Sequence, residues 1–153
     1  MRIVHFSLLF VLSVLLTSCS SLTLEHVRYG WPVEEVATVD RTNHVNSDRH
    51  GLTFSVAKIA EKELQDSTAL LGKKIRVLRN DEGYYFVTAQ GFKNVYVFSS
   101  GENELSKESI IEVSETGLRN PAFNLRPPYV ELLDSDGFRR LLTHRDIAEG
   151  NSK

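Results

Sequence analysis

Residues 74–98 read KIRVLRNDEGYYFVTAQGFKNVYVF, and this stretch decides the fold. Three runs within it are rich in β-branched and aromatic residues, which favour strands. Turn-forming residues separate the runs, with Gly83 in the first connection and Gly91 in the second. Because both connections are short, the sequence predicts a meander of three antiparallel strands. The predicted strands cover 75–78, 84–88 and 95–98.

Strand-like patterns continue on both sides of the meander. Before it, we expect 33–40 and 52–56, in which apolar and polar residues alternate, to form a hairpin around the polar loop 41–50. After it, Asp134-Ser135-Asp136-Gly137 is a turn sequence that predicts a second hairpin. The predicted strands outside the meander cover 33–40, 52–56, 109–113, 129–133 and 138–142.

Two segments break the strand pattern. Strong helix formers predict one short helix over 57–66, and a continuing strand is the alternative for this segment. The segment 114–128 is expected to be a long loop, because glycine and proline obstruct regular strand pairing. The residues that obstruct it are Gly117, Pro121, Pro127 and Pro128.

These elements predict a mainly β fold in a single domain. These short strands and one helix suit either a small antiparallel barrel or a sandwich of hairpins, and the sequence leaves both open. The globular domain is expected over 31–147, and a frayed tail over 148–153.

The composition is that of an ordinary folded domain. Its 153 residues include 18 basic and 20 acidic side chains, for a net charge of −2, with both signs interspersed. Nucleic-acid binding needs a net positive surface, so the charge argues against that class of partner. The single cysteine, Cys19, has no partner for a disulfide within the chain, and apolar packing must therefore stabilise the fold.

The N-terminal segment is built like a secretory signal. Arg2 and the free amine form a short positive leader before the apolar run Ile3–Leu16. The run is too short to span a bilayer, which takes about 20 apolar residues. It ends in Leu16-Thr17-Ser18-Cys19, in which small residues lead into the cysteine. This ending resembles the lipobox of bacterial lipoproteins.

The resemblance to bacterial lipoproteins implies a processed and lipidated chain. Residues 1–18 would be a signal peptide cleaved between Ser18 and Cys19, and residues 19–30 a lipidated tether. Cys19 would carry a thioether-linked diacylglyceryl group and an amide-linked acyl chain such as palmitate, which together hold a protein durably on a membrane. Ser20 in place of aspartate implies, for a Gram-negative source, sorting to the periplasmic face of the outer membrane.

Four side chains of metal-ligand type lie close together in the polar loop and its flank. Asp40, His44, Asp48 and His50 suit zinc or another divalent metal. A structural site usually places a Cys pair or a His pair on one regular element, which this segment lacks. We therefore expect no metal and no cofactor, with His44, Asp48 and His50 as the candidates that remain.

Aromatic residues crowd the meander and suit either a core or a ligand platform. Residues two apart on a strand share a face, so Phe86 and Tyr96 are expected to fill the core while Tyr85 points outward. Phe92 lies at a turn tip beside Gly91 and is expected to be exposed. Tyr85 and Phe92 are therefore the predicted aromatic contacts to a partner or ligand.

The densest basic cluster lies near the C-terminus and contains Arg139, Arg140, His144 and Arg145. Such a cluster can dock anionic groups of lipids or of the cell envelope. Acidic neighbours such as Glu131 can equally pair with it, and surface ion pairs of this kind are common and weak. Arg139 and Arg140 are the residues for which partner contact is predicted.

Catalytic motifs are missing from the sequence. It contains no Gly-x-Ser-x-Gly, no His-Glu-x-x-His and no glycine-rich phosphate loop, and lipidation would remove its one thiol. We expect a non-catalytic lipoprotein that binds an envelope protein as an accessory or assembly module. The alternative is a module that binds cell-wall glycan or a small ligand through exposed aromatics.

Overall fold

Strands dominate the part of the chain that the computed structural model describes, residues 34–101 and 104–148. All strand pairs are antiparallel, and the predicted mainly β fold with one short helix is confirmed. The elements are β1 (Glu35–Thr38), β2 (His44–Ser47), β3 (Leu52–Ser55), α2 (Ala57–Leu64), β4 (Lys74–Arg79), β5 (Tyr85–Ala89), β6 (Asn94–Ser100), β7 (Leu105–Glu112), β8 (Ala122–Arg126), β9 (Tyr129–Leu133), the 3₁₀ turn η1 (Ser135–Gly137) and β10 (Arg139–Leu142).

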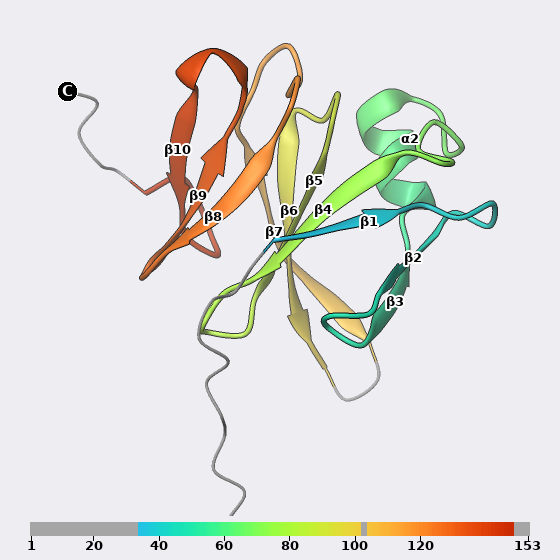
Figure 1. The fold of residues 1–153 in the computed structure, drawn as a ribbon, viewed down its shortest axis with the longest axis horizontal. Coiled ribbons are helices and arrows are strands. Elements are labelled where there is room, and N and C mark those ends of the chain that lie inside the picture. Colours follow the sequence, from blue (N-terminus) through green and yellow to red (C-terminus); the bar gives the residue numbers. More distant parts are fainter. Residues whose placement is uncertain (1–33, 102–103, 149–153) are drawn as a thin grey trace, which may run out of the picture.

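The strands form three sheets that pack as layers (Figure 1). The central layer has five strands in the order β1-β4-β5-β6-β7. One of its faces is covered by α2 and the β2–β3 hairpin, and the other by the three-stranded sheet β10-β9-β8. The arrangement is a sandwich and not a closed barrel.

The central sheet is apolar on both faces. All residues of β5 are buried. Because side chains alternate between the faces of a strand, Tyr85 and Val87 enter one hydrophobic cluster while Phe86 enters another. A sheet of this kind needs an apolar cover on each side, which explains the three layers.

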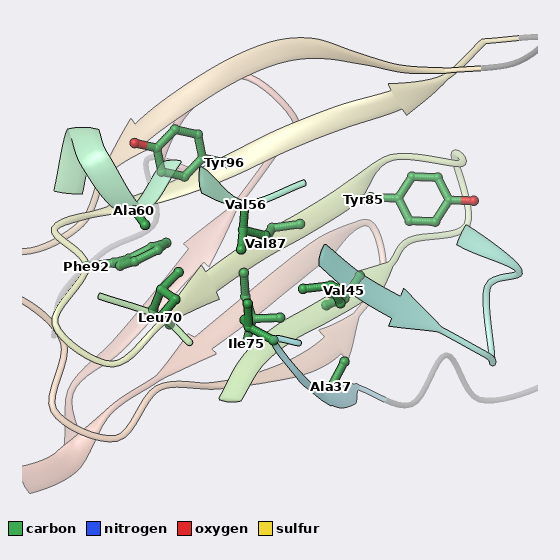
Figure 2. Packing of buried hydrophobic residues seen from close by; sticks show 13 residues of the cluster. Ala37, Val45, Val56, Ala60, Leu70, Ile75, Tyr85, Val87, Phe92 and Tyr96 are labelled. Atoms are coloured by element: carbon green, nitrogen blue, oxygen red, sulfur yellow. The ribbon is translucent and has the colours of Figure 1, made fainter. Parts of the chain in front are cut away.

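The first hydrophobic cluster lies between the central sheet, α2 and the β2–β3 hairpin (Figure 2). Figure 2 shows Val45 of β2 and Ala60 of α2 directed toward the sheet, where Ile75 and Val87 meet them. All four side chains are buried. Burying a large apolar side chain stabilises a fold by about 1.5–3 kcal/mol, so this layer contributes much of the stability.

A set of hydrogen bonds fixes α2 over the sheet. Glu63 Oε1 accepts hydrogen bonds from the side chains of Asn94 and Tyr96, and Glu63 Oε2 accepts one from the backbone N–H of Lys93, each at 2.7 Å. Burial, and then the bond to Glu63, raise the pKa of the Tyr96 hydroxyl. The hydroxyl therefore remains a donor to Glu63 at neutral pH.

The second hydrophobic cluster joins the central sheet to the three-stranded sheet. Phe86 contacts Phe123 of β8 edge to face, with ring centroids 6.4 Å apart. Glu34 adds a polar link between the two sheets. Its Oε2 lies 2.6 Å from Arg76 Nη1 of β4, and its Oε1 accepts a 2.7 Å hydrogen bond from the backbone N–H of Phe123. The described chain thus begins at a residue bound to both layers.

The central predictions about local structure are confirmed. β4, β5 and β6 pair in sequence order as the predicted meander, and β9 pairs with β10 as the predicted second hairpin. The helix α2 lies within the predicted range 57–66.

Two predicted connections are wrong. β1 pairs with β4 and not with β3, and the predicted loop 41–50 contains β2, which pairs with β3. The predicted loop 114–128 contains β8, because Pro127 and Pro128 occupy the turn after that strand and leave its own pairing intact. Arg126 and Tyr129 face each other across this turn.

Substitution of Gly117 tests a close backbone contact. A Cβ on Gly117 would lie 2.7 Å from the carbonyl oxygen of Gly91, and Gly117 has a φ of +94°. We expect Gly117→Ala to lower the free energy of unfolding by about 3 kcal/mol or more, because a clash adds to the strain of a positive φ. Urea unfolding followed by circular dichroism measures the change.

Gly72→Ala is the matched control for this substitution. Gly72 has a φ of +70°, but nothing lies within 4 Å of an added Cβ. The expected loss is only about 1–2 kcal/mol, from the left-handed backbone alone. Equal losses in the two variants would mean that the contact between Gly117 and Gly91 contributes nothing.

Candidate functional site

The predicted lipobox, Leu16-Thr17-Ser18-Cys19, lies outside the part of the chain that the structure describes. The same holds for the predicted tail, apart from Ala148. Within 34–101 and 104–148, no helix is long and apolar enough to cross a bilayer. The predicted signal 1–18, which ends at Ser18, lies outside the described residues. So do the predicted tether 19–30, which begins with Cys19 and Ser20, and residues 149–153 of the predicted tail.

The two predicted aromatic contacts are buried, and their expected exposure is wrong. Tyr85 is 5% exposed, because both faces of β5 are covered and its ring enters the first cluster. Figure 2 shows Tyr85 at one end of this cluster and Phe92 between Ala60 and Leu70. Phe92 is fully buried because its turn folds the ring back under α2. These rings belong to the core.

The predicted metal-ligand candidates do not converge. His44 Nδ1 lies 2.9 Å from the carbonyl oxygen of Thr42, and Asp48 accepts a hydrogen bond from Asn46. His50 faces a different set of residues. Among the residues that the structure describes, no group of three or more His, Cys, Asp or Glu side chains could hold a metal ion.

His50 is a largely buried histidine beside a carboxylate. Its side chain is 9% exposed, its Nε2 lies 4.0 Å from Glu35 Oε2, and its ring meets Tyr85 edge to face with centroids 5.6 Å apart. Glu35 Oε2 already accepts a 2.5 Å hydrogen bond from Ser47 Oγ. Burial lowers the pKa of His50; Glu35 opposes this shift, and two nearby arginines add to it. His50 is therefore neutral at neutral pH.

The lowered pKa of His50 predicts a loss of stability in mild acid. The usual pKa is 6.5, and the folded state holds it lower, so the unfolded chain binds a proton first as the pH falls. We expect the free energy of unfolding to decrease as the pH falls below 6.5 toward the lowered pKa of the folded state. His50→Gln should remove this dependence, and urea unfolding at several pH values measures it.

His44→Gln is the control, because His44 is exposed and begins β2, the strand that precedes the turn containing His50. It should keep the dependence of the parent chain. The carboxyl groups of Asp40, Asp66 and Asp134 have pKa values lowered from 3.8, so the stability that they contribute is lost only at lower pH. A parent chain whose stability does not change between pH 7 and pH 5 would contradict the assignment.

The basic cluster is divided between two sides of the three-stranded sheet. Leu142 of β10 is a core residue, so Arg140 shares its side of the strand and Arg139 lies on the outer face. Arg140 packs over the ring of Phe138, 5.0 Å from its centroid. Arg139 and Arg140 thus point to opposite sides of the sheet, because neighbours on a strand alternate, and their contact with a partner stays a prediction.

On the outer face, a buried carboxylate holds two exposed arginines. Glu131 of β9 is 1% exposed. Arg126 Nε lies 3.0 Å from Glu131 Oε2 and Arg139 Nε lies 3.1 Å from Glu131 Oε1, while the two arginine side chains are 55% and 58% exposed. Asn124 Nδ2 donates a 3.1 Å hydrogen bond to Oε2. We call Asn124, Arg126, Glu131 and Arg139 the arginine face.

The register of the sheet brings the arginine face together. Asn124 of β8 lies directly opposite Glu131. Arg126 is paired with the residue two positions before Glu131, and Arg139 with the residue two positions after it. Diagonal neighbours on one face of a sheet are about 7–8 Å apart, within reach of long side chains. The two arginines therefore meet Glu131 from opposite corners and shield it from water.

The arginine face has the chemistry of an anion-binding surface. Arg126 and Arg139 each contact Glu131 through Nε, the nitrogen nearest the aliphatic stem, and each side chain is more than half exposed. A guanidinium binds carboxylate or phosphate through paired hydrogen bonds. Because it stays protonated, the face suits recognition of an anion and not proton transfer.

Arg126 and Asn124 are absent from the site residues that the sequence predicts. The reason is that residues 114–128 were expected to form a loop, where the direction of a side chain is not defined. The alternation of Phe123 and Leu125 with Asn124 and Arg126 is the signal that reveals them, since it places the two polar residues on one face of a strand.

No protein-family model matches the chain, and no curated protein or solved structure matches it either. Only the geometry of its four residues therefore supports the arginine face as a candidate functional site.

A double-mutant cycle tests how the arginine face is held. We expect Arg126→Gln and Arg139→Gln each to lower the free energy of unfolding by about 1 kcal/mol, because one arginine still compensates Glu131. The double variant should lose about 3 kcal/mol or more, since it leaves a buried carboxylate without a cation. Arg140→Gln, on the other side of the strand, should cost no more than about 1 kcal/mol, from its contact with the Phe138 ring. Additive losses would contradict the shared role of Glu131.

Proposed function

We propose that this chain is a lipid-anchored protein of the cell envelope whose β-rich head binds another envelope protein, as an accessory or assembly subunit. The observation that carries the proposal is the sequence Leu16-Thr17-Ser18-Cys19 after an apolar run. Two or three acyl chains on Cys19 would attach the protein durably, because each buried methylene contributes about 0.8 kcal/mol. With Ser20 next to it, the proposed location is the periplasmic face of the outer membrane.

The position of Glu34 suits a tethered head. Glu34 is bound to both the central and the three-stranded sheet, so a pull on the preceding chain would act on the whole domain. Residues 19–33 separate the proposed anchor from this point and, at about 3.3–3.6 Å per residue, could span at most roughly 50 Å. The head would therefore stay within a short distance of the membrane.

A binding role is supported by the kind of groups that the surface presents. The arginine face offers two fixed guanidinium groups, which recognise anions but do not exchange protons at neutral pH. Arginine is also enriched among the residues that contribute most to protein interfaces. The alternative of aromatic recognition of a glycan loses its two main candidates, because Tyr85 and Phe92 are buried.

Replacement of the proposed lipidation site tests the anchor. We expect the full chain, expressed in a Gram-negative host, to fractionate with the outer membrane and to have a mass that corresponds to cleavage before Cys19 plus its acyl groups. Cys19→Ala should leave the signal uncleaved and prevent acylation, because the thiol is the group that accepts the lipid. Mass spectrometry of the purified chain measures both changes.

Crosslinking in intact cells tests the binding role separately. The native chain should crosslink reproducibly to an envelope protein, and Cys19→Ala should lose or weaken that crosslink. An acylated chain without any crosslinked protein would contradict the binding role alone, and an unmodified, soluble native chain would contradict the anchor.

A further inference from the structure

We infer that the arginine face binds an acidic, extended segment of a partner protein, with two carboxylates spaced two residues apart. The inference rests on the proposed binding role, for which it names the surface and the class of partner. It does not depend on the lipid anchor, because all four residues lie in the folded head.

Glu131 prepares the two arginines for binding. An exposed arginine normally samples many rotamers, and ordering such a side chain opposes association. Here Nε of Arg126 and Nε of Arg139 are each held within 3.1 Å of a buried carboxylate, although both side chains remain more than half exposed. The two ion pairs thus restrict the arginine side chains before a partner arrives, although Glu131 Oε1 accepts no hydrogen bond.

The spacing of the two arginines matches an extended acidic segment. Their Nε atoms lie 3.0 and 3.1 Å from the two oxygens of one carboxylate, so these atoms are no more than about 8 Å apart. Alternate side chains of an extended strand lie on one side and are about 6.6–6.8 Å apart. Because this spacing lies within the upper limit of about 8 Å, aspartate or glutamate at alternate positions can place one carboxylate near each guanidinium.

The charge of the arginine face favours a protein over a membrane surface. Basic clusters that bind anionic lipids contain about four to eight Lys or Arg residues. The arginine face has two, one of which Glu131 neutralises. Protein interfaces, in contrast, often depend on one or two arginines whose positions are well defined. Two oriented guanidinium groups with little net charge therefore suit a protein interface better than a membrane surface.

The test titrates defined peptides against the full chain purified in mild detergent. The probe is a synthetic peptide of alternating Asp and Thr, and its control alternates Asn and Thr. We expect the acidic peptide to bind and the amide peptide not to bind by isothermal titration calorimetry. Arg126→Gln combined with Arg139→Gln should weaken binding roughly tenfold or more, and Arg140→Gln should not change it.

A second variant keeps the test decisive if the double glutamine variant does not fold. Arg126→Lys with Arg139→Lys retains both charges but cannot form paired hydrogen bonds, so it should weaken binding by roughly threefold to tenfold. Thermal unfolding of each variant shows that the titrated chain is folded.

Three outcomes would overturn the inference. The first is failure of the acidic peptide to bind, and the second is unchanged affinity for that peptide in the folded arginine variants. The third is arginine-dependent binding to phosphatidylglycerol vesicles without peptide binding, which would assign the arginine face to a membrane. If the peptide fails while the native chain still crosslinks to a protein in cells, the binding role stands and only this choice of surface and partner is wrong.

Discussion

The structure depends on a central sheet that is apolar on both faces. A strand such as β5, in which all residues are buried, cannot leave either of its sides to water. The chain before β4 therefore supplies a helix and a hairpin to one face, and the chain after β7 supplies three strands to the other. Polar side chains then fix the layers in place, Glu63 for the helix and Glu34 for the three-stranded sheet.

Because the three-stranded sheet covers the central sheet with one of its sides, its other side faces outward and carries the arginine face. A covering sheet uses only one of its sides, so along β9 the residues Val130 and Leu132 point into the core while Glu131 points away from it. A carboxylate in that position would normally be exposed. It is buried here because neighbouring strands supply side chains on both sides of it: Asn124 and Leu141 lie directly opposite Glu131, and Arg126 and Arg139 contact its carboxylate.

The sequence predicts those parts of the fold that depend on neighbouring residues. The meander, the second hairpin and α2 follow from local composition, turn residues and periodicity. Strand β2 escapes prediction because Val45 is its only buried apolar residue. The burial of Tyr85 and Phe92 depends on covers that are distant in sequence, and alternation within β5 cannot reveal that both of its faces are covered. The arginine face depends on the register of β8, so one strand mistaken for a loop hides half of it.

The charge of the whole chain bears on how the arginine face would work. With a net charge of −2, the protein does not attract an acidic partner over long distances, and the Debye length of about 8 Å at physiological salt limits steering further. Fixed guanidinium groups act at contact distance, where they select the orientation of a partner more than its rate of approach. Confinement to the same membrane raises the effective concentration of two proteins without any new contact. In the proposed setting, a small oriented site on a tethered head would therefore suffice, because the anchor brings the partners together and the arginine face determines which surfaces meet.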